Sequence, residues 1–487
     1  MLSMYSSYET IIGLEIHVEL NTASKLFSPA PNHFGDEPNI NISEICTGQP
    51  GSLPKVNREA FHKALQFGLA IGATIPPVSY FDRKSYFYPD SPRGFQITQF
   101  YNPIIVGGNI RALVNGDLLE FSIHHAHLED DAGTLRHFSQ FSGVDYNRAG
   151  VPLIEIVSEP CMRTPKEASA YGQALKAVLE YLSISDCNME EGSLRMDVNI
   201  SVRKKGESLL RNKIEIKNMN SFAFMEKAIE AETKRQISIY ENGHSIQPST
   251  YRWDPEKKET VLMRLKESAE DYRYQREPDL TPLFVSKELL ETLRKKQPEL
   301  PLAKFLRYRN ELGLSEDSAA ILVSYQPLAQ YFDQALLYTS YPKQLSNWIT
   351  GEFAGRFKEM GSHLLSSKIP PNHIAYLVNL IEEKTITGKM AKLLADLLVL
   401  NPEKDPRKII QESPNFQPLS NEGEIAALIE SVIKDNPQSL IDHKAGKDRA
   451  FSYLVGQVMK RSGGKASPEI INTLLKKALI YSSNDGE

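Results

Sequence analysis

Residues 11–20 alternate between apolar and polar positions, which predicts a β-strand with one buried face. Glu15, His17 and Glu19 occupy alternate positions on the polar face, so carboxylates flank an imidazole along one side of the strand. A strand with one apolar face is ordinary, whereas a Glu-His-Glu row on the other face is a set of potential metal ligands. The apolar face consists of Ile12, Leu14, Ile16, Val18 and Leu20.

The same alternation returns in residues 194–202 and 213–217. Each of these segments alone is typical of an antiparallel sheet with one solvated face, and an isolated acidic run such as residues 129–131 is more typical of a solvated loop. Taken together, they indicate one sheet face that gathers carboxylates, a histidine and lysines. Oxygen ligands with one imidazole suit magnesium or manganese better than a structural zinc. The charged and polar positions are Arg195, Asp197, Asn199, Ser201, Lys213, Glu215, Lys217, Glu129, Asp130, Asp131, Glu190 and Glu191.

Helix signals accompany the strands in the first part of the chain. Thr164-Pro165-Lys166-Glu167 is a capping box with proline at the first helical position, and Ser221 begins a second helix that Asn242-Gly243 ends. We therefore predict an α+β domain with a largely antiparallel sheet over residues 1–292.

Strand alternation disappears after residues 297–301, and helical patterns follow. A break at residues 401–406 separates two groups of these helices. The sequence thus predicts a multi-domain chain, with an all-α domain at 293–406 and an all-α tail domain at 407–487, as its length of 487 residues favours. The expected helices are 303–312, 316–338, 344–360, 370–384, 388–399, 421–436, 446–462 and 468–480.

Composition narrows the setting. Three scattered cysteines, a first ten residues without signal-peptide character and no long apolar run predict a cytoplasmic protein that does not enter a membrane. Residues 443–477 hold eight Lys or Arg against two carboxylates, a net charge of +6 in a chain of −5, so the remainder is −11. Such a basic segment is typical of an RNA-backbone contact, but a plain solvated helix face explains it about as well. The candidate contacts are Lys444, Lys447, Lys460, Arg461 and Lys465.

Two glycine-rich segments resemble phosphate loops or hairpins. Residues 462–467 lack the P-loop spacing and are predicted to be a turn between helices, and Gly107-Gly108-Asn109 is predicted to be a hairpin turn. No Gly/Ser-rich amidase loop and no cysteine in a nucleophile context occur, so the chain has no recognisable glutaminase of its own.

Several of these segments occur, in the same order, in a known family. Over essentially its whole length the chain resembles the B subunits of bacterial aspartyl/glutamyl-tRNA amidotransferases, and residues 147–156 are a specific signature of them. The matching segments are Gly13–Leu20, Lys84–Asp90, His127–Gly133, Asp145–Ile156, Glu190–Arg195, Glu215–Asn218 and Asp271–Tyr274.

The resemblance implies a reaction. The family phosphorylates the side-chain carboxylate of Glu-tRNA(Gln) or Asp-tRNA(Asn) with ATP and Mg2+, and then replaces the phosphate with ammonia. These B subunits form a heterotrimer with two partners, an amidase that releases the ammonia (the A subunit) and a small protein (the C subunit). The three predicted domains then correspond to a catalytic cradle, a helical linker and a tRNA-binding tail.

The resemblance also implies roles for residues. Glu15, His17, Glu129 and Asp130 are the expected metal ligands and, with Asn218, the expected contacts of Mg-ATP. Lys84 is expected in the passage for ammonia, and Arg148 and Arg195 at phosphate or the substrate carboxylate. Glu190, Asp197 and Lys217 complete the expected catalytic set, in roles left undecided.

Two positions depart from the family pattern. Many relatives have a second cysteine three residues before Cys46, but Ser43 stands here, so we expect no zinc at this loop. Asp130 stands where relatives often have glutamate, which leaves open whether Glu129 or Asp130 would bind the metal. Two alternative functions are a non-catalytic tRNA-binding adaptor and a synthetase-like ligase that forms an adenylate; the chain lacks the His-x-Gly-His and Lys-Met-Ser-Lys-Ser motifs of one synthetase class.

Overall fold

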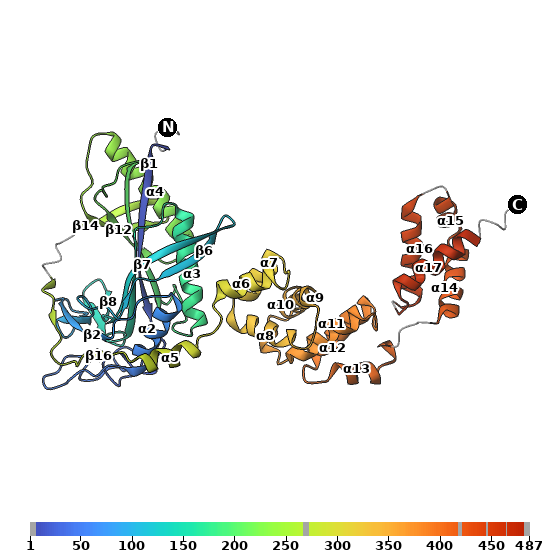
Figure 1. The fold of residues 1–487 in the computed structure, drawn as a ribbon, viewed down its shortest axis with the longest axis horizontal. Coiled ribbons are helices and arrows are strands. Elements are labelled where there is room, and N and C mark those ends of the chain that lie inside the picture. Colours follow the sequence, from blue (N-terminus) through green and yellow to red (C-terminus); the bar gives the residue numbers. More distant parts are fainter. Residues whose placement is uncertain (1–5, 266–271, 417–420, 445–446, 464, 482–487) are drawn as a thin grey trace. The chain divides into compact units, whose positions relative to one another are not determined.

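The computed structural model describes residues 6–265, 272–416, 421–444, 447–463 and 465–481 (Figure 1). It divides into two compact units, Met1–Leu302 and Ala303–Glu487. The first unit combines strands and helices, and the second is helical. The predicted α+β region followed by an all-α region is confirmed. The further division of the helical part at residue 406 stays a prediction.

A nine-stranded sheet forms the centre of the first unit. Its order is β14-β13-β12-β11-β1-β10-β7-β5, with β6 also paired to β7. Neighbouring strands are antiparallel apart from β12 and β13, so the sheet is largely antiparallel as predicted. The strands are β1 Tyr8–Glu19, β5 Ile105–Val106, β6 Asn109–Val114, β7 Asp117–Asp130, β10 Pro152–Ser158, β11 Leu194–Lys204, β12 Ile214–Met219, β13 Ser249–Asp254 and β14 Glu259–Leu265.

Short strands lie outside this sheet. Strands β15 (Gln275–Arg276), β3 (Asp82–Ser85) and β4 (Phe95–Thr98) form a three-stranded sheet. Two further pairs are β2 (Val78–Ser79) with β16 (Leu283–Phe284), and β8 (Thr134–His137) with β9 (Ser142–Asp145). The backbone N–H of Ile97 in β4 donates to the Asp130 carboxylate at the end of β7 (2.9 Å), which ties the small sheet to the large one.

Two helices cover the apolar face of the large sheet (Figure 1). The inward residues of β1, predicted from its alternation, are all buried and belong to the main core. Helix α3 (Pro165–Tyr181) begins at Thr164, whose side chain accepts from the Glu167 N–H, and α4 (Phe222–Glu241) begins at Ser221, as predicted. At Gly172 an added Cβ would lie 2.7 Å from Phe222 Cε1, so glycine lets the two helices approach closely. The opposite face of the sheet is left for the polar residues.

The helical unit follows the predicted pattern with some differences. The segment 316–338 is two helices, because the chain turns at Ser324–Tyr325 before Pro327. The turn at 462–467 separates α16 from α17, as predicted. The helices of this unit are α6 Pro301–Asn310, α7 Glu316–Val323, α8 Gln326–Leu336, α9 Pro342–Asn347, α10 Ala354–Glu359, α11 Pro371–Glu382, α12 Gly388–Leu400, α13 Pro406–Glu412, α14 Glu422–Asp435, α15 Pro437–Lys444, α16 Asp448–Arg461 and α17 Pro468–Tyr481.

The predicted hairpin at residues 107–109 is wrong. Gly107 and Gly108 do connect β5 to β6, but both strands pair with β7 and not with each other. Both glycines have positive φ, so the chain bends sharply there and β6 continues along another part of β7. The helices α2 (Arg58–Ala70), α5 (Lys287–Lys295), α13 and α15 were also not predicted. Within the described ranges, no helix is long and apolar enough to cross a membrane.

Candidate active site

The strand register brings charged residues from separate parts of the chain into one row. Strand β1 lies between β10 and β11, and His17 stands opposite Glu155 on one side and Arg195 on the other. Glu15 stands opposite Asp197. Because residues opposite one another in an antiparallel pair point to the same face, the alternation in β1 places all of these side chains on the polar face.

His17 and Glu129 form the centre of this face, together with Glu155. His17 Nε2 lies 3.6 Å from Glu129 Oε1 and 3.5 Å from Glu155 Oε2. On the far side of the two carboxylates, His127 Nε2 lies 3.4 Å from Glu155 Oε2 and 3.7 Å from Glu129 Oε2. The His127 Nδ1 atom is buried and has no hydrogen-bond partner in the described part of the chain. Two carboxylates are thus held between two imidazoles.

Proton affinities in this cluster reflect the crowded charges. Burial works against the imidazolium form of His17, but hydrogen bonding to Glu155 and the charges of the carboxylates raise its pKa to about 9. Burial likewise favours a protonated Glu155, yet His127 and His17 hold its pKa below the usual range. A cation therefore stabilises this position, whether it is a proton on an imidazole or a metal ion that replaces it.

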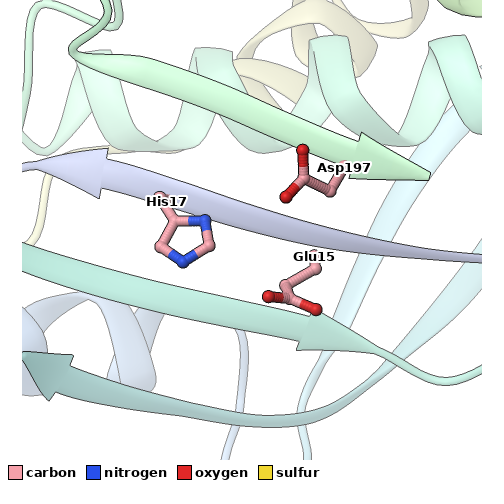
Figure 2. A group of neighbouring side chains, drawn as sticks. All are labelled: Glu15, His17 and Asp197. Carbon is pink, nitrogen blue, oxygen red and sulfur yellow. The ribbon is translucent and has the colours of Figure 1, made fainter. Parts of the chain in front are cut away.

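Two overlapping groups of side chains have donor atoms close enough to share one metal ion. Ligand atoms of His17, Glu129 and Glu155 lie within 4.8 Å of one another, as do those of Glu15, His17 and Asp197. Figure 2 shows Glu15 and His17 on one strand and Asp197 on the neighbouring strand. Carboxylate oxygens with one imidazole fit magnesium or manganese, so the residues present suit the metal that the sequence predicts.

Lys217 of β12 borders the second group. Its Nζ donates to Asp197 Oδ2 (2.8 Å) and lies 3.2 Å from Glu215 Oε1. Burial lowers the pKa of Lys217, but the carboxylates of Asp197 and Glu215 raise it well above its ordinary value. Because this ammonium already holds Asp197, the first group has the more available carboxylates. The side chain of Asn218, the next residue, lies outside the part of the structure that is described.

Asp131 joins two arginines beside the cluster. Arg148 Nε donates to Asp131 Oδ2 (2.6 Å), and Arg195 Nη2 donates to the same oxygen (2.7 Å). Burial favours protonated Asp131, but the guanidinium groups of Arg195 and Arg148 hold its pKa below the usual range. Arg195 Nε is buried without an acceptor among the described residues, so the guanidinium keeps an unused donor. Burial and the charge of Asp131 raise the pKa of Glu19 to about 7.

Asp130 does not join the His17 cluster. It forms an ion pair with Arg93 and accepts from the Ile97 N–H, so both carboxylate oxygens are already bonded. Successive residues of a strand point to opposite sides, so Glu129 and Asp130 cannot both reach His17. The structure therefore separates two residues that the sequence placed together. It favours Glu129 as the ligand.

A cavity of about 570 Å3 opens on this polar face. Lys84 lines it with its Nζ 5.0 Å from the centre of the Tyr272 ring. Burial lowers the pKa of Lys84, but Glu129 and other neighbours raise it above its ordinary value, so it is a cation. Glu190 is exposed in the turn before β11 and does not line the cavity. Other predicted residues on its wall are His17, Glu129, Asp130, Arg195, Asp197 and Lys217.

Sequence reasoning missed Glu155 and His127. Both lay within segments that carried the family resemblance, but neither was assigned a role. The signal that could have found them is the same period of two, because His125, His127 and Glu129 alternate in β7. The partner of Glu155 across the strands is His127 on one side and His17 on the other, which only the register reveals.

The basic tail residues differ in their contacts. Lys460 is exposed, Lys465 is half-buried, and Lys447 pairs with Asp442 (2.9 Å). Arg461 bonds to Ser431 and Asp435. The side chain of Lys444 lies outside the described residues.

Comparison with known proteins gives the class first. The family model "GatB/GatE catalytic domain" matches residues 10–291, and the "GatB domain" model matches residues 330–479. The chain is 59% identical over 482 residues to the B subunit of the aspartyl/glutamyl-tRNA(Asn/Gln) amidotransferase of Protochlamydia amoebophila, covering 98% of this chain and 97% of the relative. It is 56% identical over 481 residues to the corresponding protein of Chlamydia pneumoniae, covering 98% and 99%. The chain belongs to this family of amidotransferase B subunits, as its sequence segments indicated.

Proposed function

We propose that this chain amidates Glu-tRNA(Gln), Asp-tRNA(Asn) or both, by phosphorylating the side-chain carboxylate with Mg-ATP and then accepting ammonia. The amidotransferase family to which it belongs supports the overall reaction, a transamidation in protein biosynthesis. The observation that carries the phosphorylation step is the cluster of His17, Glu129 and Glu155 at a cavity lined by arginine and lysine. This is a cation site next to groups that bind anions.

The chemistry explains why both kinds of group are needed. A carboxylate resists attack by ammonia because it is anionic and its oxygen is a poor leaving group. Transfer of the γ-phosphoryl of ATP to that oxygen gives an acyl phosphate and ADP; ammonia then displaces inorganic phosphate and forms the amide. When bound at this cluster, the metal would offset the negative charge on the transferring phosphoryl group.

The residues of the chain would position the reactants. Arg148 and Arg195, held side by side by Asp131, form a fixed pair of guanidinium groups suited to a phosphate or to the substrate carboxylate. Lys217 would orient Asp197, and Lys84 would attract the anionic acceptor and border the route by which ammonia arrives. ATP would be bound through carboxylates and cations, because the sequence contains no P-loop.

Ammonia has to be supplied from outside this chain, because the sequence has no recognisable glutaminase. The proposed partners in a heterotrimer are an amidase (the A subunit) together with a small protein (the C subunit). The tail, with Lys444, Lys447, Lys460, Arg461 and Lys465, is the proposed contact for the tRNA backbone. Of these, exposed Lys460 is the best placed for such a contact.

Nucleotide analysis tests the proposal. The reconstituted complex, given mischarged tRNA, ATP, magnesium and glutamine, should release ADP and phosphate in step with amidated tRNA. Release of AMP and pyrophosphate would instead support the adenylating ligase. Unchanged ADP formation in a His17→Ala complex would support the adaptor alternative, in which the carboxylates of this chain are structural.

A further inference from the structure

Lys25 is one of the largest fully buried side chains in the protein, with 0% of its surface exposed. Lysine is among the residues least often buried, because removing an ammonium from water is costly unless hydrogen bonds and a counter-charge replace the water. Lys25 stands apart from the residues assigned above to metal, ATP or ammonia. Its burial therefore needs a separate explanation.

The Lys25 ammonium holds one turn of the chain. Its Nζ donates to the carbonyl of Ala149 (2.7 Å) and to that of Tyr146 (3.2 Å). Its methylene chain packs on Gly150, where an added Cβ would lie 3.4 Å from Lys25 Cδ. Gly150 also has a φ of +89°, so the turn is tight at the point where Lys25 meets it. Lys25 thus fixes both the direction of two carbonyls and the packing of the turn.

Cys46 supplies the counter-charge. Its Sγ lies 3.2 Å from Ser28 Oγ and 3.5 Å from Ser43 Oγ, and the thiol is buried in the same pocket as the Lys25 ammonium. Burial raises the pKa of the Cys46 thiol, but hydrogen bonds from Ser28 and Ser43 and the charge of Lys25 bring it below its ordinary value. Burial lowers the pKa of Lys25, and Cys46 opposes that effect, as do the more distant charges of Asp130 and Asp145.

The turn that Lys25 holds carries Arg148. Ala149 N–H donates to the Tyr146 carbonyl (3.0 Å) and Val151 N–H donates to the Arg148 carbonyl (3.0 Å), so the residues around Arg148 are linked by successive turn hydrogen bonds. Ala149 and Gly150 line the active-site cavity, and Arg148 reaches Asp131 beside it. Moving the carbonyls toward Lys25 or away from it would therefore move the guanidinium.

We propose that Lys25 and Cys46 act as a positioning pair, in which a Cys46 thiolate keeps the buried Lys25 charged and Lys25 sets the turn that presents Arg148. The assignment of Arg148 to phosphate or to the substrate carboxylate rests on the proposed function. The hydrogen bonds and burial of the pair do not. The pair is a positioning element, since neither residue has to touch the substrate.

Exchange of Cys46 for two residues of equal shape tests the need for charge. Cys46→Asp keeps a negative partner for Lys25, whereas Cys46→Asn has the same size without the charge. In the full complex, Cys46→Asn should lower kcat about tenfold or more while the KM for tRNA changes less than about twofold, as expected for a misplaced positioning group. Cys46→Asp should retain most of the activity. Equal activity of the two variants would overturn the proposal.

Thiol reactivity gives a second test that does not depend on activity or on the folding of the Cys46 variants. N-ethylmaleimide alkylation of Cys46 is followed against pH by mass spectrometry in a Cys161→Ser background, because Cys161 is partly exposed. The midpoint should lie below the ordinary value for a thiol, about 8.5, and should rise by about one unit or more in Lys25→Met. An unshifted midpoint overturns the pair.

The two tests also separate this inference from the proposed function. Absence of ATP-dependent phosphoryl transfer in the wild-type complex would contradict the proposed function and leave the alkylation midpoints unaffected. An alkylation midpoint that ignores Lys25, in a complex that makes ADP normally, would contradict only the positioning pair.

Discussion

Replacement of Asp131 by Asn should release both arginines of the candidate active site. The side chain of Asp131 is 7% exposed and receives hydrogen bonds from Arg148 (2.6 Å) and Arg195 (2.7 Å). Breaking a buried ion pair costs about 3–5 kcal/mol, but the arginine side chains are 37% and 35% exposed, so water compensates for part of the loss. We expect a loss of about 2 kcal/mol in the free energy of unfolding, and a fall in Tm of about 4 °C for a unit of this size.

The loss should depend on pH with a defined sign. The folded-state pKa of Asp131 is depressed, so its contribution to stability is present above its unfolded pKa of about 3.9 and disappears as the pH falls through the folded value. Wild type and Asp131→Asn should therefore differ fully at neutral pH and converge in strong acid. Differential scanning calorimetry between pH 7 and pH 3 measures this difference.

Asp130→Asn is the matched control. It removes the same charge from the neighbouring residue, but there the partners are Arg93 and the Ile97 N–H. Asp130→Asn should destabilise the protein at least as much, because the side chain of Arg93 is only 13% exposed. Asp131→Asn should lower kcat for amidation by about tenfold or more, and by clearly more than Asp130→Asn does. Equal effects on kcat would refute the assignment of Arg148 and Arg195.

Three further predictions follow from the candidate site and the tail. His17→Ala or Glu15→Ala should abolish ATP-dependent amidation and spare the glutaminase activity of the partner; in wild type, Mg2+ affinity should weaken as the pH falls below about 9, where a proton occupies His17, and wild-type amidation in both variants would remove these residues from the site. Elemental analysis should find no stoichiometric zinc, because Ser43 leaves Cys46 without a second cysteine, and one zinc per chain would contradict this. Charge reversal of three tail residues should raise the KM for tRNA and flatten its salt dependence by roughly one unit of slope per contact, with kcat little changed; an unchanged slope would assign the tail to solvation. The three residues are Lys460, Arg461 and Lys465.

Strand periodicity was enough to predict the polar face of the sheet. The buried residues of β1 and the alternation of β11 were predicted because each depends on a local pattern with a period of two. The N-termini of α3 and α4 were predicted because Thr164 and Ser221 cap their own helices through local hydrogen bonds. Such features need no knowledge of distant partners.

Long-range register was not available from the sequence. Glu155 meets His17 and His127 only because β10 lies between β1 and β7, and a strand order of this kind is not encoded in any one segment. The same limit applies to Asp130, whose partner Arg93 comes from a loop before β4. Gly107-Gly108 was misread for this reason as well, since a bend and a hairpin have the same local composition and differ only in what the next strand pairs with.

Oxygen-isotope transfer tests the central claim most directly. The tRNA is charged with glutamate or aspartate that carries 18O in both side-chain carboxylate oxygens, and the complex is supplied with ATP, magnesium and glutamine. Phosphorylation of the carboxylate predicts one 18O in the inorganic phosphate for each amide formed, with the other retained in the amide. Phosphate without 18O, or 18O in AMP, would contradict the account.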